Sequence, residues 1–474
     1  MSKWPSLTDL VEQVRTGQTS ATELVERSLD TIAKQSGFNA VISTTEKRAR
    51  ARAKEIDDQI KSGKKSGKLL GVPFIAKDNI LTFGGETTAA SNILKGFGAP
   101  YQSTAIELIE AEGGICVAKA NLDAFGHGAS TENSDFMVTK NPRNISKVSG
   151  GSSGGSAAAV ILEMVPFALG TDTGGSIRQP AAYVGAVGYK PTYGLVSRSG
   201  VIAMASSTDV VGPLTNTVED AAYILDVIAA RDELDSTTIE RDEKGYRISG
   251  KTLKGAKIGV IKEYFSEGVE EGVASSVRAA ISKLKAQGAI VEEVSLPSLP
   301  LALASYYIIM PAEVSSNLSR YDGQRFGHTS ASAGNLDQSY SQSRSEGFGK
   351  EAKRRIMIGT YVISSGYYDA YYAKAQKLRT KLINEFNQAF SKYDFLVGPT
   401  APTVAFDIGK NVNDPLKMYL NDIMTVAANL TGVPSISIPA DLSEGLPVGF
   451  QIMAPQRSDR QLLNFAVEAE EAIK

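Results

Sequence analysis

KVSGGSSGGSAAAVILEMV (residues 147–165) and ALGTDTGGSIRQPAA (168–182) are two glycine-rich turns in quick succession. The first leads from glycine pairs around Ser152 and Ser153 into an alanine-rich helical stretch, and the second leads from an apolar strand to Ser176. Glycines allow close backbone approach and positive φ angles, and they direct free N–H groups into a cavity at a helix N-terminus. Strands, turns and helices that alternate in this way indicate an α/β sheet with polar chemistry at the turns.

A turn of this kind could also cradle a phosphate, but the Lys-Ser/Thr ending of a P-loop and the GxGxxG spacing are both absent. In the second turn the backbone N–H groups of residues 173–176 can converge on one point beside the Ser176 hydroxyl. That is oxyanion-hole geometry, in which each donor contributes on the order of 3 kcal/mol to transition-state stabilisation. We therefore expect a serine nucleophile, with Thr173, Gly174 and Gly175 as oxyanion donors.

A serine hydroxyl needs a base, and the chain has only two histidines. Lys77 ends the apolar strand LLGVPFIAKDNI (69–80), a desolvated position that lowers a lysine pKa and favours the neutral amine. A lone lysine at a strand end is usually solvated, and the pair of serine turns is what favours a base here. His127, between two glycines, offers a Ser–His alternative that lacks an orienting carboxylate.

Composition narrows the class of protein. The 474 residues carry 50 Lys plus Arg against 52 Asp plus Glu, so the net charge of -2 provides no bulk positive field for a nucleic acid. The single cysteine, Cys116, lies in an apolar run and excludes an internal disulfide or a thiolate zinc cluster. Two histidines are too few for a multi-histidine metal site. Without a basic-then-apolar leader or a membrane-length apolar run, we expect a bacterial or archaeal cytoplasmic protein, or an already processed organellar one, with no membrane contact.

The chain shows no internal repeat, so we expect a single domain over residues 1–474. Capping-box spacing and helical periodicity predict helices in the N-terminal region. From residue 69 onward, short apolar runs alternate with helical stretches. The predicted parts are a helical region (1–68), a core (69–213) and two inserted surface loops (230–250 and 323–350).

LLGVPFIAKDNI, GGSSGGSAAA and GTDTGGSIRQPAAYVGAVGYKPTYGLVS resemble the amidase signature family. This resemblance implies a central mixed, twisted β-sheet covered by helices on both faces, and a Lys–Ser–Ser triad. Ser176 would form the acyl intermediate, Ser152 would relay the proton, and Lys77 would serve as base and later as acid. Ser153 is then a structural hydroxyl, and residues 172 and 178 (Asp and Arg) form an ion pair that braces the loop.

Segments 306–327, 353–372 and 421–439 are similar to one branch of that family, the A subunits of aspartyl/glutamyl-tRNA amidotransferases. Free glutamine carries an α-ammonium and an α-carboxylate, so its pocket needs one acidic and one basic side chain. The matching positions are Asp422 and Arg355. The alternatives are a helix cap for the aspartate and a charged helix face for the arginine.

The same resemblance assigns a hydroxyl contact to Tyr307, with Tyr306 as the other possible register, and places Ser130 and Thr131 near the amide. His127 departs from the apolar residue, usually methionine, of the tRNA-dependent relatives, and could tune substrate fit. His328, in a Gly/Ser loop, is expected at the surface.

The branch implies that glutamine is hydrolysed and that its ammonia passes through a channel to a kinase-like B subunit, with a small C subunit bracing the pair. ATP, magnesium and most tRNA contacts would belong to the B subunit, leaving this chain without a metal or cofactor. Two alternatives stay open: a free-standing amidase acting on small or fatty amides, and a non-catalytic interaction subunit.

Overall fold

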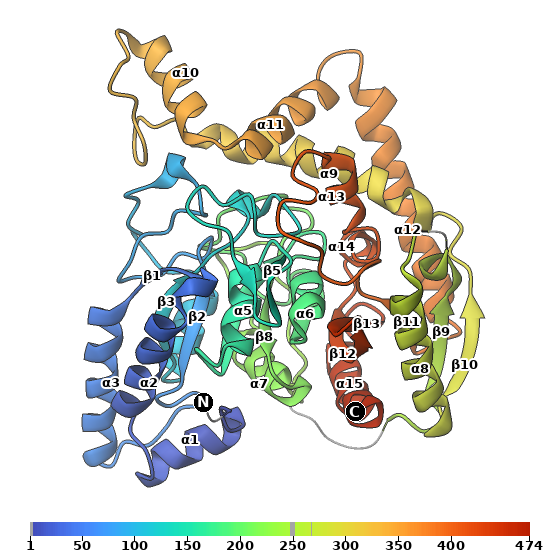
Figure 1. Ribbon diagram of the computed structural model, residues 1–474, viewed down its shortest axis with the longest axis horizontal. Coiled ribbons are helices and arrows are strands. Elements are labelled where there is room, and N and C mark those ends of the chain that lie inside the picture. The colour runs from blue at the N-terminus through green and yellow to red at the C-terminus, as the bar shows by residue number, and fades with distance from the viewer. Residues whose placement is uncertain (1–2, 247–251, 267) are drawn as a thin grey trace.

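A mixed sheet forms the centre of the computed structural model, which describes residues 3–246, 252–266 and 268–474 (Figure 1). Within the described residues the sheet has 11 strands in the order β1-β3-β2-β6-β8-β7-β12-β13-β11-β9-β10. Their bounds are β1 (Val41–Thr44), β2 (Pro73–Lys77), β3 (Ile115–Ala120), β6 (Phe167–Asp172), β7 (Val187–Lys190), β8 (Val210–Thr215), β9 (Lys257–Ile261), β10 (Ile290–Val294), β11 (Phe395–Pro399), β12 (Ser435–Ser443) and β13 (Leu446–Met453). A separate hairpin pairs β4 (Lys140–Asn141) with β5 (Asn144–Val148).

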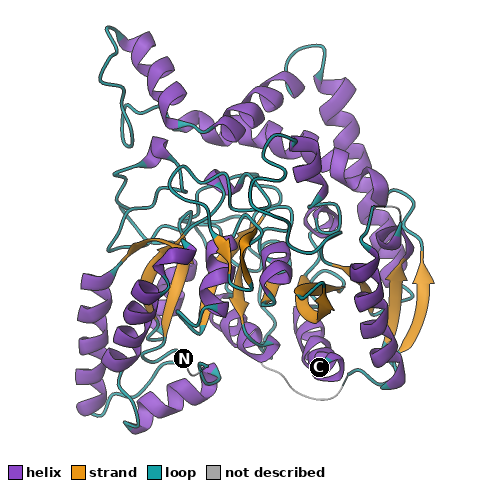
Figure 2. Cartoon of the chain, in the orientation of Figure 1, coloured by secondary structure: helices purple, strands orange, loops and turns teal. Residues whose placement is uncertain are grey.

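Helices flank this sheet, as the α/β prediction requires, and both chain ends lie on the same side of the molecule (Figure 2). Their bounds are α1 (Leu7–Thr16), α2 (Ala21–Lys34), α3 (Glu46–Lys61), α4 (Thr104–Ala111), α5 (Gly154–Ile161), α6 (Arg178–Val184), α7 (Val218–Ile228), α8 (Glu271–Ala286), α9 (Ala302–Asn317), α10 (Leu336–Gly347), α11 (Lys350–Val362), α12 (Lys374–Phe390), α13 (Pro415–Leu420), α14 (Val426–Thr431) and α15 (Asp459–Ile473). The predicted capping box is present at the start of α2, where Ser20 and Glu23 satisfy each other's backbone N–H groups.

The position of the site follows from one parallel pairing. β2 pairs in parallel with β6, with Ile75 opposite Ala168, and the Phe74 and Phe167 rings stack at 5.3 Å between centroids. Parallel neighbours end at the same edge of a sheet. The last residue of β2, Lys77, therefore lies beside the last residues of β6, from which the second glycine turn begins.

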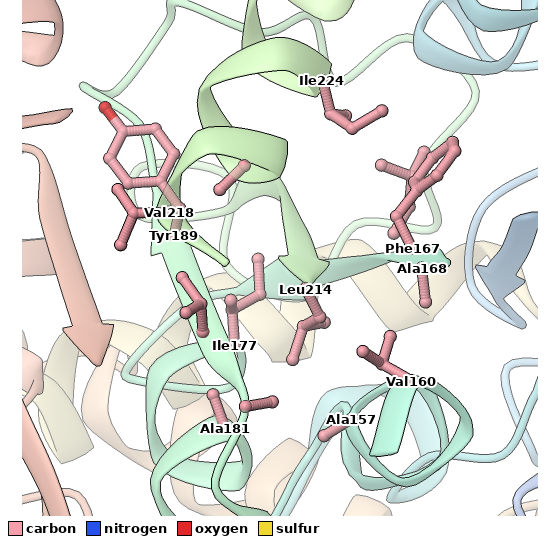
Figure 3. Close-up of a cluster of buried hydrophobic side chains, with 14 of the residues drawn as sticks. Ala157, Val160, Phe167, Ala168, Ile177, Ala181, Tyr189, Leu214, Val218 and Ile224 are labelled. Atoms are coloured by element: carbon pink, nitrogen blue, oxygen red, sulfur yellow. The ribbon is translucent and has the colours of Figure 1, made fainter. Parts of the chain in front are cut away.

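Apolar packing fixes the helices that carry the turns. Figure 3 shows Val160 of α5 and Ala181 of α6 on one side of the strands, and Ile224 of α7 on the other, with Leu214 of β8 among them. All four side chains are buried. Both serine turns are therefore anchored to helices that the core holds in place. The cysteine of β3 is buried as expected.

Two parts of the chain differ from the sequence-based expectation. The N-terminal region includes strand β1, which pairs antiparallel with β3 at the sheet edge and is too short to show a period in the sequence. The stretch 323–350 is a helix over Leu336–Gly347, because Asn335 caps its N-terminus and Arg344 donates to the carbonyls of Leu318 and Tyr321. Residues 230–246 contain neither helix nor strand, and the rest of the predicted loop 230–250 lies outside the described residues.

In the described ranges, no helix combines the length and the apolar character needed to cross a membrane.

Candidate active site

Lys77 ends β2 in full burial, with its amine against the first serine turn. Its Nζ lies 2.8 Å from Ser152 Oγ, 2.8 Å from Ser153 Oγ and 2.9 Å from Thr171 Oγ1. Burial lowers the pKa of Lys77 to about 7, although nearby aspartates act in the opposite direction. A large share of the amine is therefore neutral near neutral pH and can accept a proton.

The hydrogen bonds around Lys77 leave its lone pair for one serine. Ser153 Oγ donates to the carbonyl of Thr171 at 3.1 Å, so it accepts a bond from the amine. Ser152 Oγ has no other hydrogen-bond partner among the described residues, and its O–H is free to donate to Lys77 Nζ. This asymmetry agrees with Ser153 as a structural hydroxyl and Ser152 as the residue placed to pass on a proton.

Ser176 lies in the turn after β6 and is the most accessible of the three residues, at 8% exposure against 1% for Ser152. Its carbonyl accepts the N–H of Ser153 at 3.0 Å, which ties the two glycine turns together. Within the described residues, no hydrogen bond joins the Ser152 and Ser176 hydroxyls directly. The structure thus places Lys77 in hydrogen-bond contact with Ser152 and joins the two turns through their backbones. The hydroxyls of Ser152 and Ser176 are not bonded to each other.

One backbone N–H of the oxyanion turn already has an acceptor in the protein. The N–H of Gly175 donates to Asp172 Oδ1 at 2.9 Å in this conformation, and Gly175 as an oxyanion donor stays a prediction. The Asp172 carboxylate lies inside the turn and captures this N–H. In the described part of the chain, the N–H groups of Thr173, Gly174 and Ser176 have no protein acceptor, and these remain the available donors.

Close neighbours explain why both turn residues are glycines. A Cβ on Gly175, which has φ +135°, would come within 2.1 Å of Thr425 Oγ1. A Cβ on Gly174 would lie 2.6 Å from the Tyr306 hydroxyl. Tyr306 therefore contacts the oxyanion turn, a role that its place in the sequence did not reveal.

Asp172 and Arg178 form the predicted brace of the loop. Both side chains are fully buried, and the guanidinium donates Nε and Nη2 to the two carboxylate oxygens at 3.0 Å each. The same guanidinium reaches Asn429 Oδ1 at 2.7 Å and Gln451 Oε1 at 2.6 Å. The positive charge of Arg178 and its hydrogen bonds outweigh burial and hold the pKa of Asp172 at about 2. Asp172 is thus ionised and structural.

Replacing Arg178 tests this brace. Arg178→Met leaves the buried Asp172 charge unpaired, so we expect the free energy of unfolding to fall by about 3–5 kcal/mol, with a parallel loss of turnover. Urea unfolding measures the first effect. Arg231→Met, which removes an ion pair 70% and 73% exposed, is the control and should leave the unfolding midpoint close to that of the wild type. Equal effects of the two variants would contradict the brace.

The three residues expected around glutamine lie together. Tyr307 Oη donates to Asp422 Oδ2 at 2.7 Å, and the Arg355 guanidinium lies 5.3 Å from the centre of the Tyr307 ring. Arg355 is only 3% exposed, which excludes the alternative of a solvated helix face. The Asp422 carboxylate bonds Tyr307 instead of capping a helix, and burial raises its pKa to about 7.

Two further members of this cluster were missed. Glu351 Oε1 accepts Arg355 Nε at 2.9 Å, and Tyr419 donates to the same oxygen at 2.8 Å while stacking on Tyr307 at 4.0 Å. The spacing of Glu351 and Arg355 on one helix is the i,i+4 signal that could have found the pair. No local pattern connects the tyrosine to them.

Ser130 and Thr131 have different environments. Thr131 Oγ1 donates to the carbonyl of Gly150 at 2.7 Å and accepts the N–H of Gly154 at 3.2 Å, so its hydroxyl holds the first serine turn. Its expected position near the amide stays a prediction. Ser130 Oγ is buried without a partner among the described residues and stays available. Asp123, also missed, anchors the segment by accepting both backbone N–H groups.

The histidine alternative fails on geometry. No hydrogen bond joins a ring nitrogen of the buried His127 to a carboxylate or any other group in the described ranges. It therefore lacks the orienting partner that a Ser–His base needs. His328 lies at the surface as expected, 2.8 Å from Glu346.

Fold and site together define the class: an α/β enzyme whose site is built from glycine turns at strand ends. No cluster of three or more His, Cys, Asp or Glu suited to a metal occurs in residues 3–246, 252–266 and 268–474.

The chain belongs to the amidase family, whose model matches residues 23–463. It is 51% identical to a Thermoanaerobacter pseudethanolicus protein that is named as the A subunit of glutamyl-tRNA(Gln) amidotransferase, covering 98% of this chain and 96% of the relative. A protein of the same name from Geobacillus thermodenitrificans is also 51% identical, over 96% and 94% of the two chains. The crystal structure of the Thermotoga maritima protein of this name matches with a TM-score of 0.79 at 42% identity, over 94% and 90%.

Proposed function

We propose that this chain is the A subunit of a glutamyl-tRNA(Gln) amidotransferase and hydrolyses glutamine to supply ammonia. The relatives that match it over nearly their full length carry that name. The single observation that carries the chemical part is the buried Lys77 amine bonded to Ser152, beside a turn with free N–H groups.

In the proposed reaction, Ser176 attacks the side-chain amide of glutamine and forms an acyl-serine. The oxyanion accepts hydrogen bonds from the N–H groups of Thr173, Gly174 and Ser176, which have no competing acceptor within the described protein. Lys77 takes the Ser176 proton through Ser152 and returns it to the departing ammonia. This relay needs the two serine hydroxyls to come into contact when substrate binds, as catalytic hydrogen bonds often do.

The side chains around Arg355 offer one basic and one acidic group, as an amide that also carries an α-carboxylate and an α-ammonium requires. Glu351 uses Arg355 Nε and the Met310 sulfur lies 3.5 Å from Nη1, so Nη2 can meet an α-carboxylate. Once ionised, Asp422 can accept a hydrogen bond from the α-ammonium, while Tyr307 donates to its Oδ2. A pocket with one acid and one base favours glutamine over simple aliphatic amides.

Ammonia released into water would be protonated and lost, so the proposal includes transfer to a B subunit within a complex that also holds a C subunit. ATP, magnesium and most contacts to the misacylated tRNA would belong to the B subunit, in the cytoplasm. The product would be Gln-tRNA(Gln), and Asn-tRNA(Asn) is a second product to test. The net charge of -2 agrees with a tRNA held mainly by a partner.

The direct test measures hydroxamate formation from glutamine and hydroxylamine, compared with a series of aliphatic amides, with and without the co-purified B and C subunits. The proposal expects glutamine to be preferred. A preference for aliphatic amides would instead identify a free-standing amidase, and no turnover in the intact complex would identify a non-catalytic subunit.

Asp422→Asn tests the substrate assignment. Losing the charge that faces the α-ammonium should raise the KM for glutamine by about 10–100-fold, because hydrogen bonds between charged groups are the stronger kind. Glutaramate, which lacks the α-amine, should be affected little. Asp441→Asn, at an exposed position of β12, is the matched control. Equal losses on both substrates would refute an ammonium contact.

A further inference from the structure

Thr425 is a buried threonine whose hydroxyl is not used where its position in the chain would place it. It lies at the N-cap of α14 and is 0% exposed, yet its side chain makes no capping hydrogen bond. A threonine at an N-cap usually accepts a backbone N–H from the first turn of the helix. The Thr425 hydroxyl instead donates to the carbonyl of Gly174 at 2.5 Å. A hydroxyl that would ordinarily cap the helix is therefore directed at the oxyanion turn.

This hydrogen bond holds one peptide unit of the turn. The carbonyl of Gly174 and the N–H of Gly175 belong to the same trans peptide, so they point in opposite directions. Thr425 donates to the carbonyl, and Asp172 accepts the N–H at 2.9 Å. No other protein donor reaches this carbonyl among the described residues. The orientation of this peptide therefore sets where the neighbouring oxyanion donors, the N–H groups of Gly174 and Ser176, point.

Thr425 is itself fixed by the segment that carries Asp422. Its N–H donates to the Asp422 carbonyl at 3.0 Å, and its hydroxyl lies 3.1 Å from the same oxygen. A hydroxyl has one hydrogen to donate, and the shorter distance assigns it to Gly174. The Thr425 carbonyl accepts Arg178 Nη2 at 3.1 Å, and a Cβ added to Gly175 would come within 2.6 Å of the Thr425 Cβ. These contacts join the oxyanion turn to the residue proposed to bind the α-ammonium.

We infer that Thr425 is a positioning residue: its hydroxyl holds the peptide between Gly174 and Gly175 so that the neighbouring N–H groups meet the oxyanion formed on the substrate amide. The inference rests on the proposed function, because it concerns the turn that would stabilise the intermediate of that reaction. Oxyanion donors are most effective when they already point to the place where charge develops. Thr425 acts through the turn, and no contact between its side chain and the substrate is required.

Thr425→Val removes the hydroxyl and keeps the shape of the side chain. The Gly174 carbonyl then loses its donor, and the turn can rotate away from the orientation that the oxyanion needs. We expect kcat for glutamine to fall by roughly 10–100-fold with KM within about twofold of the wild type, because small misplacements of catalytic groups have effects of that order. Thr425→Ser keeps the donor and should recover kcat to within about threefold of the wild type.

Two kinetic results would overturn the inference. One is a Thr425→Val enzyme whose kcat stays within about twofold of the wild type. The other is a Thr425→Ser enzyme that is no faster than Thr425→Val, since the serine retains the O–H group to which the effect is assigned.

Thr431 provides the matched control. It is the last residue of the same helix and is 2% exposed, and its hydroxyl donates to the carbonyl of Ala427 at 2.8 Å. Thr431→Val makes the same chemical change within the helix and should leave kcat and KM unchanged. A loss of kcat equal to that in Thr425→Val would show that removing any buried hydroxyl from this helix has the effect, and the positioning role would be overturned.

A binding measurement separates alignment of the turn from a general loss of structure. In the inactive Ser176→Ala protein, adding Thr425→Val should leave the Kd for glutamine, measured by calorimetry, within about twofold of the single variant. A Kd that rises in proportion to the loss of kcat would contradict a role confined to the turn.

The inference and the proposed function fail in different ways when the intact complex is assayed. If wild type and Thr425→Val hydrolyse glutamine equally well, the Thr425 inference fails alone. If the wild type prefers aliphatic amides to glutamine, the proposed function fails, and kcat of the Thr425 variants on the preferred amide decides the inference. A wild-type complex that turns over no amide would overturn both.

Discussion

Ser176→Ala is expected to abolish glutamine hydrolysis, with kcat/KM falling by at least about 10⁴-fold, because no other group can form the acyl intermediate. The Ser176 hydroxyl has no hydrogen-bond partner among the described residues, so the melting temperature should be close to that of the wild type. Hydroxamate formation measures the first effect and thermal unfolding the second.

Ser156→Ala is the matched control for this variant. Ser156 is a buried serine of the helix that follows the first turn, and its hydroxyl donates to Leu169 O at 3.0 Å. We expect the opposite pattern, a loss of about 1 kcal/mol of stability with turnover retained. A Ser176→Ala protein that keeps more than about 1% of wild-type turnover would remove Ser176 as the nucleophile.

Lys77→Met should also remove turnover, by at least about 10³-fold, while making the protein more stable at neutral pH. The folded state holds the Lys77 pKa at about 7, below its ordinary value of 10.5, so folding disfavours the ammonium. The unfolded chain binds more protons between these values, and stability therefore rises with pH across that window. Methionine removes this penalty, so the advantage of the variant should be largest below pH 7 and disappear near pH 10.5.

The same pKa sets the pH dependence of the wild type. The base works as the neutral amine, so kcat/KM should rise as pH increases through about 7 and then level off. Lys119→Met is the control for the stability gain expected in Lys77→Met. Lys119 is a buried lysine of the neighbouring strand, and its Nζ lies 3.5 Å from Asp78. Its removal leaves a buried carboxylate unpaired and should destabilise the protein. An unchanged pH profile in Lys77→Met with substantial residual rate would refute the base assignment.

Local chemistry made much of the site predictable. The glycine turns, the apolar strand ending at Lys77 and the serines within the turns are short patterns that specify backbone conformation and reactive groups without distant contacts. The α/β class followed from the same alternation, and the amidase resemblance added the roles of Ser152 and Ser176. A short edge strand such as Val41–Thr44 escaped because four residues carry too little periodicity.

Hydrogen-bond allocation was beyond the reach of local patterns. Gly175 and Thr131 have residue types that suit a substrate site. In the structure, however, Asp172 accepts the Gly175 N–H, and the Gly150 carbonyl accepts the Thr131 hydroxyl. Glu351 lies one helical turn from its arginine, but only packing shows that a tyrosine far along the chain shares its oxygen. Competition among donors and acceptors is decided by distance, which the sequence does not state.

The sequence by itself therefore determined the reactive groups, the turns that present them and the fold class, since these depend on neighbours along the chain. Only the tertiary structure decided that β2 runs beside β6, so that Lys77 meets Ser152, and that His127 is buried with both ring nitrogens free of protein partners within the described residues. The physical reason is that strand pairing and burial bring together residues far apart in the chain, and these contacts set which polar groups are satisfied and which pKa values shift.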